Sequence, residues 1–147
     1  MSKYLVAVGA ALVLAGSGGT AYAHHSFAMY DQTQTRTYTG KLTRYIPGSN
    51  HAQLIFELVG PDGKPVPGKD GKPSIWGVET ASAVAMARVG VSPKTFPNGT
   101  IFTVTLFPLR DGRPFGAMAG TLIRCGMTMP AGGCTKDTGE ILAVDNT

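Results

Sequence analysis

Charged residues, histidine, cysteine and tryptophan are all scarce in this sequence. The 147 residues include 13 Lys+Arg and 9 Asp+Glu, so 15% are charged, against about 25% in an average globular domain. With 43% hydrophobic residues, this composition excludes the collagen-like, coiled-coil and intrinsically disordered classes. A net charge of +4 without a run of Lys or Arg argues against nucleic acid as a partner. The length leaves no room for a separate cofactor domain.

The common catalytic signatures are absent as well. The sequence has no Gly-x-Ser-x-Gly elbow, no His-Glu-x-x-His motif and no phosphate-binding glycine loop before a helix. Glu57 and Glu79 are a candidate carboxylate pair, for which separate surface positions are the preferred interpretation. The sequence therefore leans against an enzyme and leaves the biochemical activity open.

The chain opens with a segment typical of a secretory signal. Lys3 precedes the apolar residues 5–15, and residues 21–23 read Ala-Tyr-Ala, which matches a cleavage site. The apolar run is shorter than the about 20 residues that a membrane-spanning helix needs. We therefore predict cleavage after Ala23, which leaves residues 24–147 as a single periplasmic or secreted domain without a transmembrane segment.

Cys125 and Cys134 are the two cysteines of the chain. Export into an oxidising compartment predicts a disulfide between them. A ring this short would stabilise the fold by about 2–3 kcal/mol. The alternative is a soft Cu(I) site that these cysteines form with Met127 and Met129.

Alternating apolar residues predict a mainly β domain. Strands are expected over residues 38–42, 52–58, 75–79, 100–108, 118–123 and 141–144. A single helix is expected over residues 81–89, with Thr80 as its N-cap and Gly90 at its C-terminal end. This order matches a small OB-like barrel of five to six antiparallel strands, with one short helix between the third and fourth strands. An open, sandwich-like sheet is the alternative.

A repeated turn motif separates two of these strands. Asp-Gly-Lys-Pro occurs at residues 62–65 and again at residues 70–73. Asp-Gly favours tight turns, so we expect an expanded loop whose charges are solvated. Binding of a protein partner by Lys64, Lys69 and Lys72 is the alternative role for this loop.

Two of the three histidines stand where the signal peptide would end. After cleavage His24 would carry a free α-amino group beside its imidazole, and His25 follows directly. These nitrogens can chelate a metal ion, and His51 before the second strand is a further candidate ligand. Nitrogen ligands favour Cu(II), followed by Ni(II) and Zn(II). In the alternative, the first two histidines are a solvated terminus and His51 bonds a backbone group at a turn.

Four stretches of the chain resemble a known family. Residues 24–31 read His-His-Ser-Phe-Ala-Met-Tyr-Asp, residues 50–52 Asn-His-Ala, residues 76–79 Trp-Gly-Val-Glu and residues 108–113 Pro-Leu-Arg-Asp-Gly-Arg. Together they resemble a family of small exported proteobacterial proteins of unknown function that begin His-His-Ser-Phe after the signal peptide. Members usually have Asn-Pro-His where this chain has Ser-Asn-His. The resemblance implies an exported small β-domain without an established activity.

Three hypotheses for the function follow. The first is a non-catalytic binding or accessory module that holds Cu(II) through His24, with His25 or His51 completing the site. The second is a protein-interaction or structural module without metal. The third is an oxidative copper enzyme, which would need an open coordination position and an accessible substrate surface.

Overall fold

The computed structural model describes residues 27–143, and the elements follow the predicted order. A 3-10 turn, η1 (Phe27–Met29), comes first. The other elements are β1 (Arg36–Ile46), β2 (Gln53–Leu58), β3 (Ile75–Glu79), α1 (Ala83–Arg88), β4 (Ile101–Pro108), β5 (Phe115–Gly126) and β6 (Glu140–Ala143). Each predicted strand is confirmed, although β1 and β5 are longer than the pattern indicated. The predicted signal peptide, His24 and His25 lie outside the described residues.

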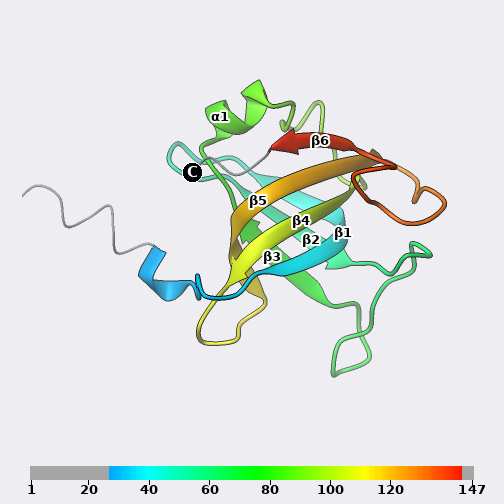
Figure 1. The fold of residues 1–147 in the computed structure, drawn as a ribbon, viewed down its shortest axis with the longest axis horizontal. Helices are drawn as coiled ribbons and strands as arrows, with labels where there is room; N and C mark the ends of the chain where they lie inside the picture. Colours follow the sequence, from blue (N-terminus) through cyan, green and yellow to red (C-terminus); the bar gives the residue numbers. More distant parts are fainter. Residues whose placement is uncertain (1–26, 144–147) are drawn as a thin grey trace, which may run out of the picture.

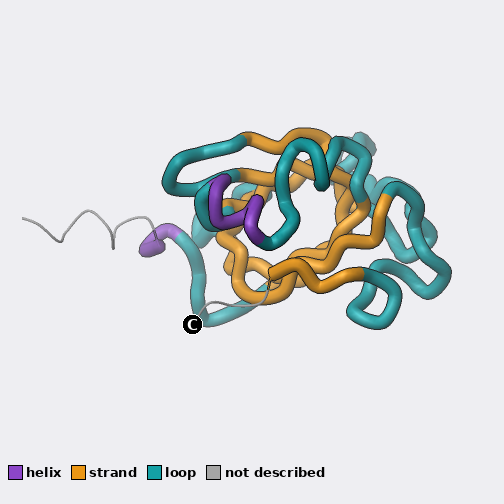
Figure 2. Tube along the Cα trace, turned by 90° about the horizontal axis from the view of Figure 1, so that it is seen from above, coloured by secondary structure: helices purple, strands orange, loops and turns teal. Residues whose placement is uncertain are grey.

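The strands form a closed barrel with one extra strand. Their order is β3-β2-β1-β4-β5-β6, and a further pairing of β3 with β5 closes the first five into the ring that Figure 2 shows. The OB-like barrel is thus confirmed, and the alternative of an open sheet is wrong. One detail is corrected, because β3 and β5 are parallel and the sheet is therefore mixed. The chain reverses twice between these strands, through α1 and again after β4, so β5 runs in the direction of β3.

Alternating side chains fill the interior of the barrel. On β4, Phe102, Val104 and Leu106 are fully buried, as the alternation predicted. The ring of Phe102 meets the rings of Phe56 and Phe96 edge-on, at centroid distances of 5.1 and 5.3 Å. Burial of one such side chain contributes about 1.5–3 kcal/mol. Phe96 lies in the segment between α1 and β4, so the core also contains a residue that belongs to no strand.

The single helix is shorter than predicted and begins later. Its N-cap is Ser82, whose hydroxyl oxygen accepts a hydrogen bond from the amide of Ala85 at 3.2 Å. The predicted cap, Thr80, is wrong because its amide and hydroxyl both donate to the carbonyl of Ala52, which prolongs the β2–β3 pairing. Gly90 follows the helix with a positive φ of 88°, as predicted. Figure 2 shows α1 across one end of the barrel, where Met86 is buried in the core.

No helix within residues 27–143 is long and apolar enough to cross a membrane.

The predicted disulfide is present. Cys125 at the end of β5 is bonded to Cys134, with 5.7 Å between their Cα atoms. Cys134 packs with Ile101 and Ile123 in a small cluster beside the main core. Its carbonyl oxygen also accepts a hydrogen bond from the Thr103 hydroxyl at 2.7 Å. Because both sulfurs are in the disulfide, the alternative Cu(I) site lacks its thiolate ligands.

The repeated Asp-Gly-Lys-Pro motif forms the same turn twice. The carboxylates of Asp62 and Asp70 each accept a hydrogen bond at 3.1 Å from the amide two residues later. These turns project as the long green loop at the lower right of Figure 1. The three lysines of this loop are exposed, as the solvated-loop interpretation predicted: Lys64, Lys69 and Lys72.

Candidate functional site

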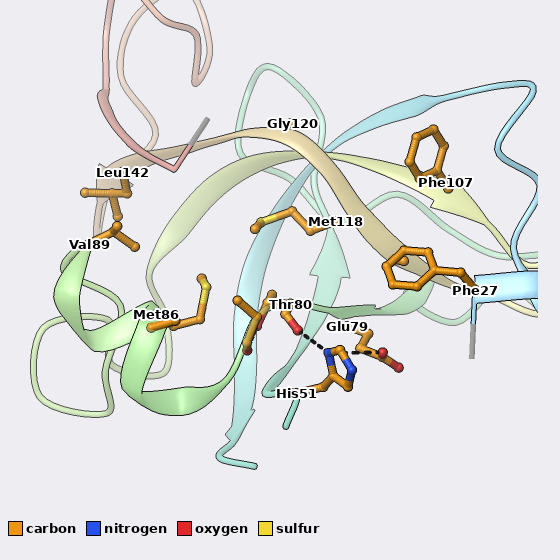
Figure 3. Close-up of a pocket in the computed structure, with 13 residues that line it drawn as sticks. Phe27, His51, Glu79, Thr80, Met86, Val89, Phe107, Met118, Gly120 and Leu142 are labelled. Carbon is orange, nitrogen blue, oxygen red and sulfur yellow. Dashed lines mark hydrogen bonds and ion pairs between the residues drawn. The ribbon is translucent and has the colours of Figure 1, made fainter. Parts of the chain in front are cut away.

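A cavity lies where β3 and β5 separate. The parallel pairing that closes the barrel ends at Glu79 and Ala117. Beyond this pair β3 turns away to α1, while β5 continues along β4 with Leu106 opposite Met118. A cavity of about 450 Å³ occupies the space between the two strands and the helix (Figure 3).

The lining of the cavity is apolar on most sides and polar along one edge. Its apolar residues come from α1, from the C-cap of that helix and from three strands, and include Ala85, Met86, Val89, Phe107, Met118 and Leu142. Phe27 covers the cavity from η1, while His51, Glu79 and Thr80 form the polar edge. Gly120 also lines it, in a bulge of β5 where φ is +108°, a conformation that favours glycine.

His51 is held at this edge by its ring nitrogen Nδ1. Nδ1 lies 3.0 Å from the carbonyl oxygen of Thr80 and 3.4 Å from Oε1 of Glu79. A carbonyl oxygen can only accept a hydrogen bond, so we assign the proton of the neutral ring to Nδ1. Nε2 then carries the lone pair, and Figure 3 shows this nitrogen pointing away from Thr80. The side chain is 41% exposed, so a ligand can approach it from solution.

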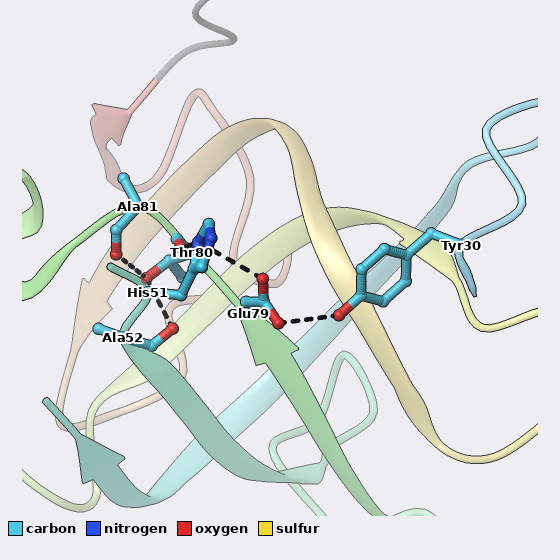
Figure 4. Close-up of polar contacts among 6 residues, drawn as sticks. All are labelled: Tyr30, His51, Ala52, Glu79, Thr80 and Ala81. Carbon is cyan, nitrogen blue, oxygen red and sulfur yellow. Dashed lines mark hydrogen bonds and ion pairs between the residues drawn. The ribbon is translucent and has the colours of Figure 1, made fainter. Parts of the chain in front are cut away.

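Glu79 joins His51 to a buried tyrosine. The hydroxyl of Tyr30 donates a hydrogen bond to Oε2 of Glu79 at 3.0 Å (Figure 4). Tyr30 is 1% exposed. Burial, followed by the hydrogen bond and the charge of Glu79, raises the pKa of the Tyr30 phenol far above its usual value. The phenol therefore stays protonated and orients the carboxylate toward His51.

The N-terminal segment carries Tyr30 to the site because it is bound to the end of β4. Tyr30 forms an isolated bridge with Leu109, and the amide of Asp31 donates to the carbonyl of Pro108 at 2.8 Å. Arg110 donates from its backbone amide to the Met29 carbonyl and from its side chain to the Ala28 carbonyl. These bonds place η1 beside Glu79 and Ala117, the last residue pair between β3 and β5.

The site residues that the sequence predicts are only partly placed together. His51 lies at the cavity and its Nδ1 bonds a backbone carbonyl, as the turn interpretation predicted, and Nε2 has no hydrogen bond to any of the residues 27–143. Within the described residues, no three His, Cys, Asp or Glu side chains come together as a metal site. His51 and Glu79 thus supply part of a site at most. Glu57 and Glu79 do not face each other, because they pair with Ile75 and Gln53 at opposite ends of β3 and β2.

Sequence reasoning missed the contacts of Glu79 with Tyr30 and His51. A signal was present in the four stretches that carry the family resemblance. The first three each contribute a residue to the cavity lining, and the fourth is bonded to the first through Arg110. Tyr30 lies in the first stretch, His51 in the second, Glu79 in the third and Arg110 in the fourth. Their meeting could not be read from spacing, since no two of these stretches are neighbours in the chain.

Fold and site together define a small OB-like barrel with a partly apolar cavity where β3 and β5, the strands that close the barrel, separate. The chain belongs to DUF6152, a family of unknown function, which it matches over residues 11–119. The match includes every residue of the polar edge and ends before the disulfide loop and β6. No curated protein and no solved structure matches the chain.

Proposed function

We propose that the protein is an exported, non-catalytic binding module that holds Cu(II) at the edge of this cavity. Cleavage after Ala23 creates the site, because it frees the α-amino group of His24. The amine and the imidazole of His24 chelate the ion. His51 completes the site through Nε2, and His25 is the further candidate ligand.

The hydrogen bonding of His51 is the observation that carries this proposal. Metal-binding histidines usually donate their second ring N–H to a carbonyl or a carboxylate, which fixes the tautomer and the orientation of the ring. Nδ1 of His51 has such an acceptor in the Thr80 carbonyl, and the Glu79 carboxylate lies 3.4 Å away. The nitrogen left with the lone pair is the one that a metal ion needs.

Chain connectivity supports the same arrangement. Phe27 and His51 line one cavity, and His24 precedes Phe27 by only three positions in the sequence. An extended chain covers about 3.3–3.6 Å per residue, so three residues span roughly 10 Å. A tether this short supports a position of the His24 amine near the cavity that His51 lines. A set of amine and imidazole nitrogens favours Cu(II) over the other divalent ions of the first transition row.

Titration of Cu(II) into metal-stripped protein that begins at His24 tests the proposal. We expect one equivalent to bind, with nitrogen coupling in the electron paramagnetic resonance spectrum. A form that retains residues 20–23 moves the amine away from the imidazole of His24 and should bind at least about tenfold more weakly. Equal affinity of the two forms would overturn the chelate.

Substitution of His51 tests the second half of the site. His51→Ala should weaken Cu(II) binding by at least about tenfold, whereas Asn50→Ala, a neighbouring polar substitution, should leave it unchanged. Intact mass of the exported protein gives the cleavage position and any bound metal together. Export of a chain that still carries residues 1–23 would contradict the first step of the proposal.

The loop with the repeated turns favours a second candidate function, a protein-interaction module without metal. Lys64, Lys69 and Lys72 project from the barrel and are exposed. Crosslinking in the native compartment should then recover a partner, and replacement of the three lysines by alanine should abolish the crosslink. An unchanged crosslink would contradict the role of this loop.

A further inference from the structure

We propose that the same cavity binds a small organic ammonium ion with an apolar body. This inference does not rest on copper, because it uses the interior of the cavity and the carboxylate of Glu79. Charge is the first argument. Among the described residues that line the cavity, Glu79 carries the one carboxylate, and none is a Lys or Arg. A cationic group is therefore the head group that this lining can pair with.

Glu79 is prepared to accept such a group. Its side chain is only 18% exposed, and the Tyr30 hydroxyl fixes Oε2. Each carboxylate oxygen has two lone pairs, so the bond from Tyr30 and the longer contact with His51 leave acceptor capacity unused. A carboxylate that is already oriented loses little freedom when a ligand binds, which increases affinity.

Aromatic rings provide the second contact for a cation. Phe27 and Phe107 both line the cavity, and Figure 3 shows them on the same side of it as Glu79. The face of an aromatic ring attracts ammonium groups within about 6 Å of its centre. An ammonium ion at Glu79 would thus pair with the carboxylate and contact these rings.

The opposite side of the cavity suits the apolar body of the ligand. Met86, Val89, Met118 and Leu142 line it there, and none of them offers a hydrogen-bond donor. The volume of about 450 Å³ is within the range of small-molecule pockets. An anionic ligand with the same body would bring its charge to Glu79 without a positive partner. The cavity therefore discriminates by charge among ligands of equal size.

Three probes with one apolar body test this discrimination: benzylammonium, benzyl alcohol and benzoate. They are titrated at neutral pH into the metal-stripped chain that begins at His24, and binding is followed by calorimetry and by amide chemical shifts. We expect benzylammonium to bind at least about tenfold more tightly than benzoate, with benzyl alcohol between them. The shifts should centre on Glu79, Met86 and Ala117. Equal affinities for the charged probes, or no binding of any probe, would overturn the proposal.

Two cavity variants and one control variant test which residues give the preference for the ammonium probe. Glu79→Gln should remove the advantage of benzylammonium over benzyl alcohol, while Glu57→Gln, a matched change outside the cavity, should keep it. Phe27→Leu changes a residue that is 40% exposed, and should weaken benzylammonium more than benzyl alcohol. Equal losses in Glu79→Gln and Glu57→Gln would also contradict the proposal. Copper uptake is measured separately on the same samples, so failure of one proposal leaves the other assessable.

Discussion

Glu79 is the residue on which the two proposals meet. Its carboxylate lies between a buried phenol and an imidazole, and each neighbour has a different role. Tyr30 holds the carboxylate in place, while His51, whose side chain is 41% exposed, is the candidate metal ligand. One carboxylate thus lies beside a metal-ligand candidate and brings a negative charge to the cavity.

Removal of the Tyr30 hydroxyl should lower the free energy of unfolding. Tyr30→Phe deletes a hydrogen bond to a charged acceptor, and we expect the free energy of unfolding to fall by about 1.5 kcal/mol at pH 7. Urea denaturation of both proteins measures the difference. A difference near zero would show that water replaces the phenol at Glu79.

The same pair of proteins has a defined pH dependence. Folding raises the pKa of the Tyr30 phenol, so its contribution to stability is complete below about pH 10, the usual value for tyrosine. The contribution is lost as pH rises toward the higher folded value. The stability difference between the wild type and Tyr30→Phe should therefore be constant from pH 7 to about 9 and shrink above about pH 10. A difference that grows with pH in that range would contradict the assignment.

At the scale of elements, the cavity forms where β3 and β5 separate. Parallel pairing stops after Glu79, and the short helix that follows covers the opening only in part. Ser82 is the N-cap rather than Thr80, because the amide and hydroxyl of Thr80 both donate to the carbonyl of Ala52 and prolong the β2–β3 pairing. Thr and Ser are both common N-cap residues, so the local sequence could not decide between Thr80 and Ser82.

The assignment of the cap predicts the effect of two substitutions. Ser82→Ala removes the acceptor for the Ala85 amide and should destabilise the protein by about 1 kcal/mol. Ser82→Asp keeps an acceptor and should change stability little. Thermal unfolding of both variants measures these effects. Equal losses in the two variants would show that Ser82 acts through packing rather than through the cap.

At the scale of the whole molecule, the disulfide and the barrel are separate sources of stability. The main core consists of residues from β1 to β5, α1, β6 and the segment around Phe96, whereas Cys134 belongs to a small cluster beside it. The disulfide closes a loop with a sequence separation of nine residues. Its loss should therefore weaken the barrel without opening it.

Removal of the disulfide by substitution tests whether the barrel folds without it. The double variant Cys125→Ser, Cys134→Ser should lose about 2–3 kcal/mol of unfolding free energy. The near-ultraviolet circular dichroism of Trp76, which packs against Tyr38 with a centroid distance of 4.5 Å, should remain. Loss of that signal in the absence of denaturant would mean that the ring closure is needed for the barrel itself.

The sequence by itself determined the strands, their order along the chain and the disulfide. These depend on alternation, turn residues and a single possible cysteine pairing. The sequence also singled out His51. Only the tertiary structure decided the parallel closure of the barrel, the cap at Ser82 and the contacts of Tyr30, Glu79 and His51. The physical reason is distance along the chain, since Tyr30 and Glu79 are 49 positions apart. No local pattern brings such residues together, and the closed barrel does so at the point where β3 and β5 part.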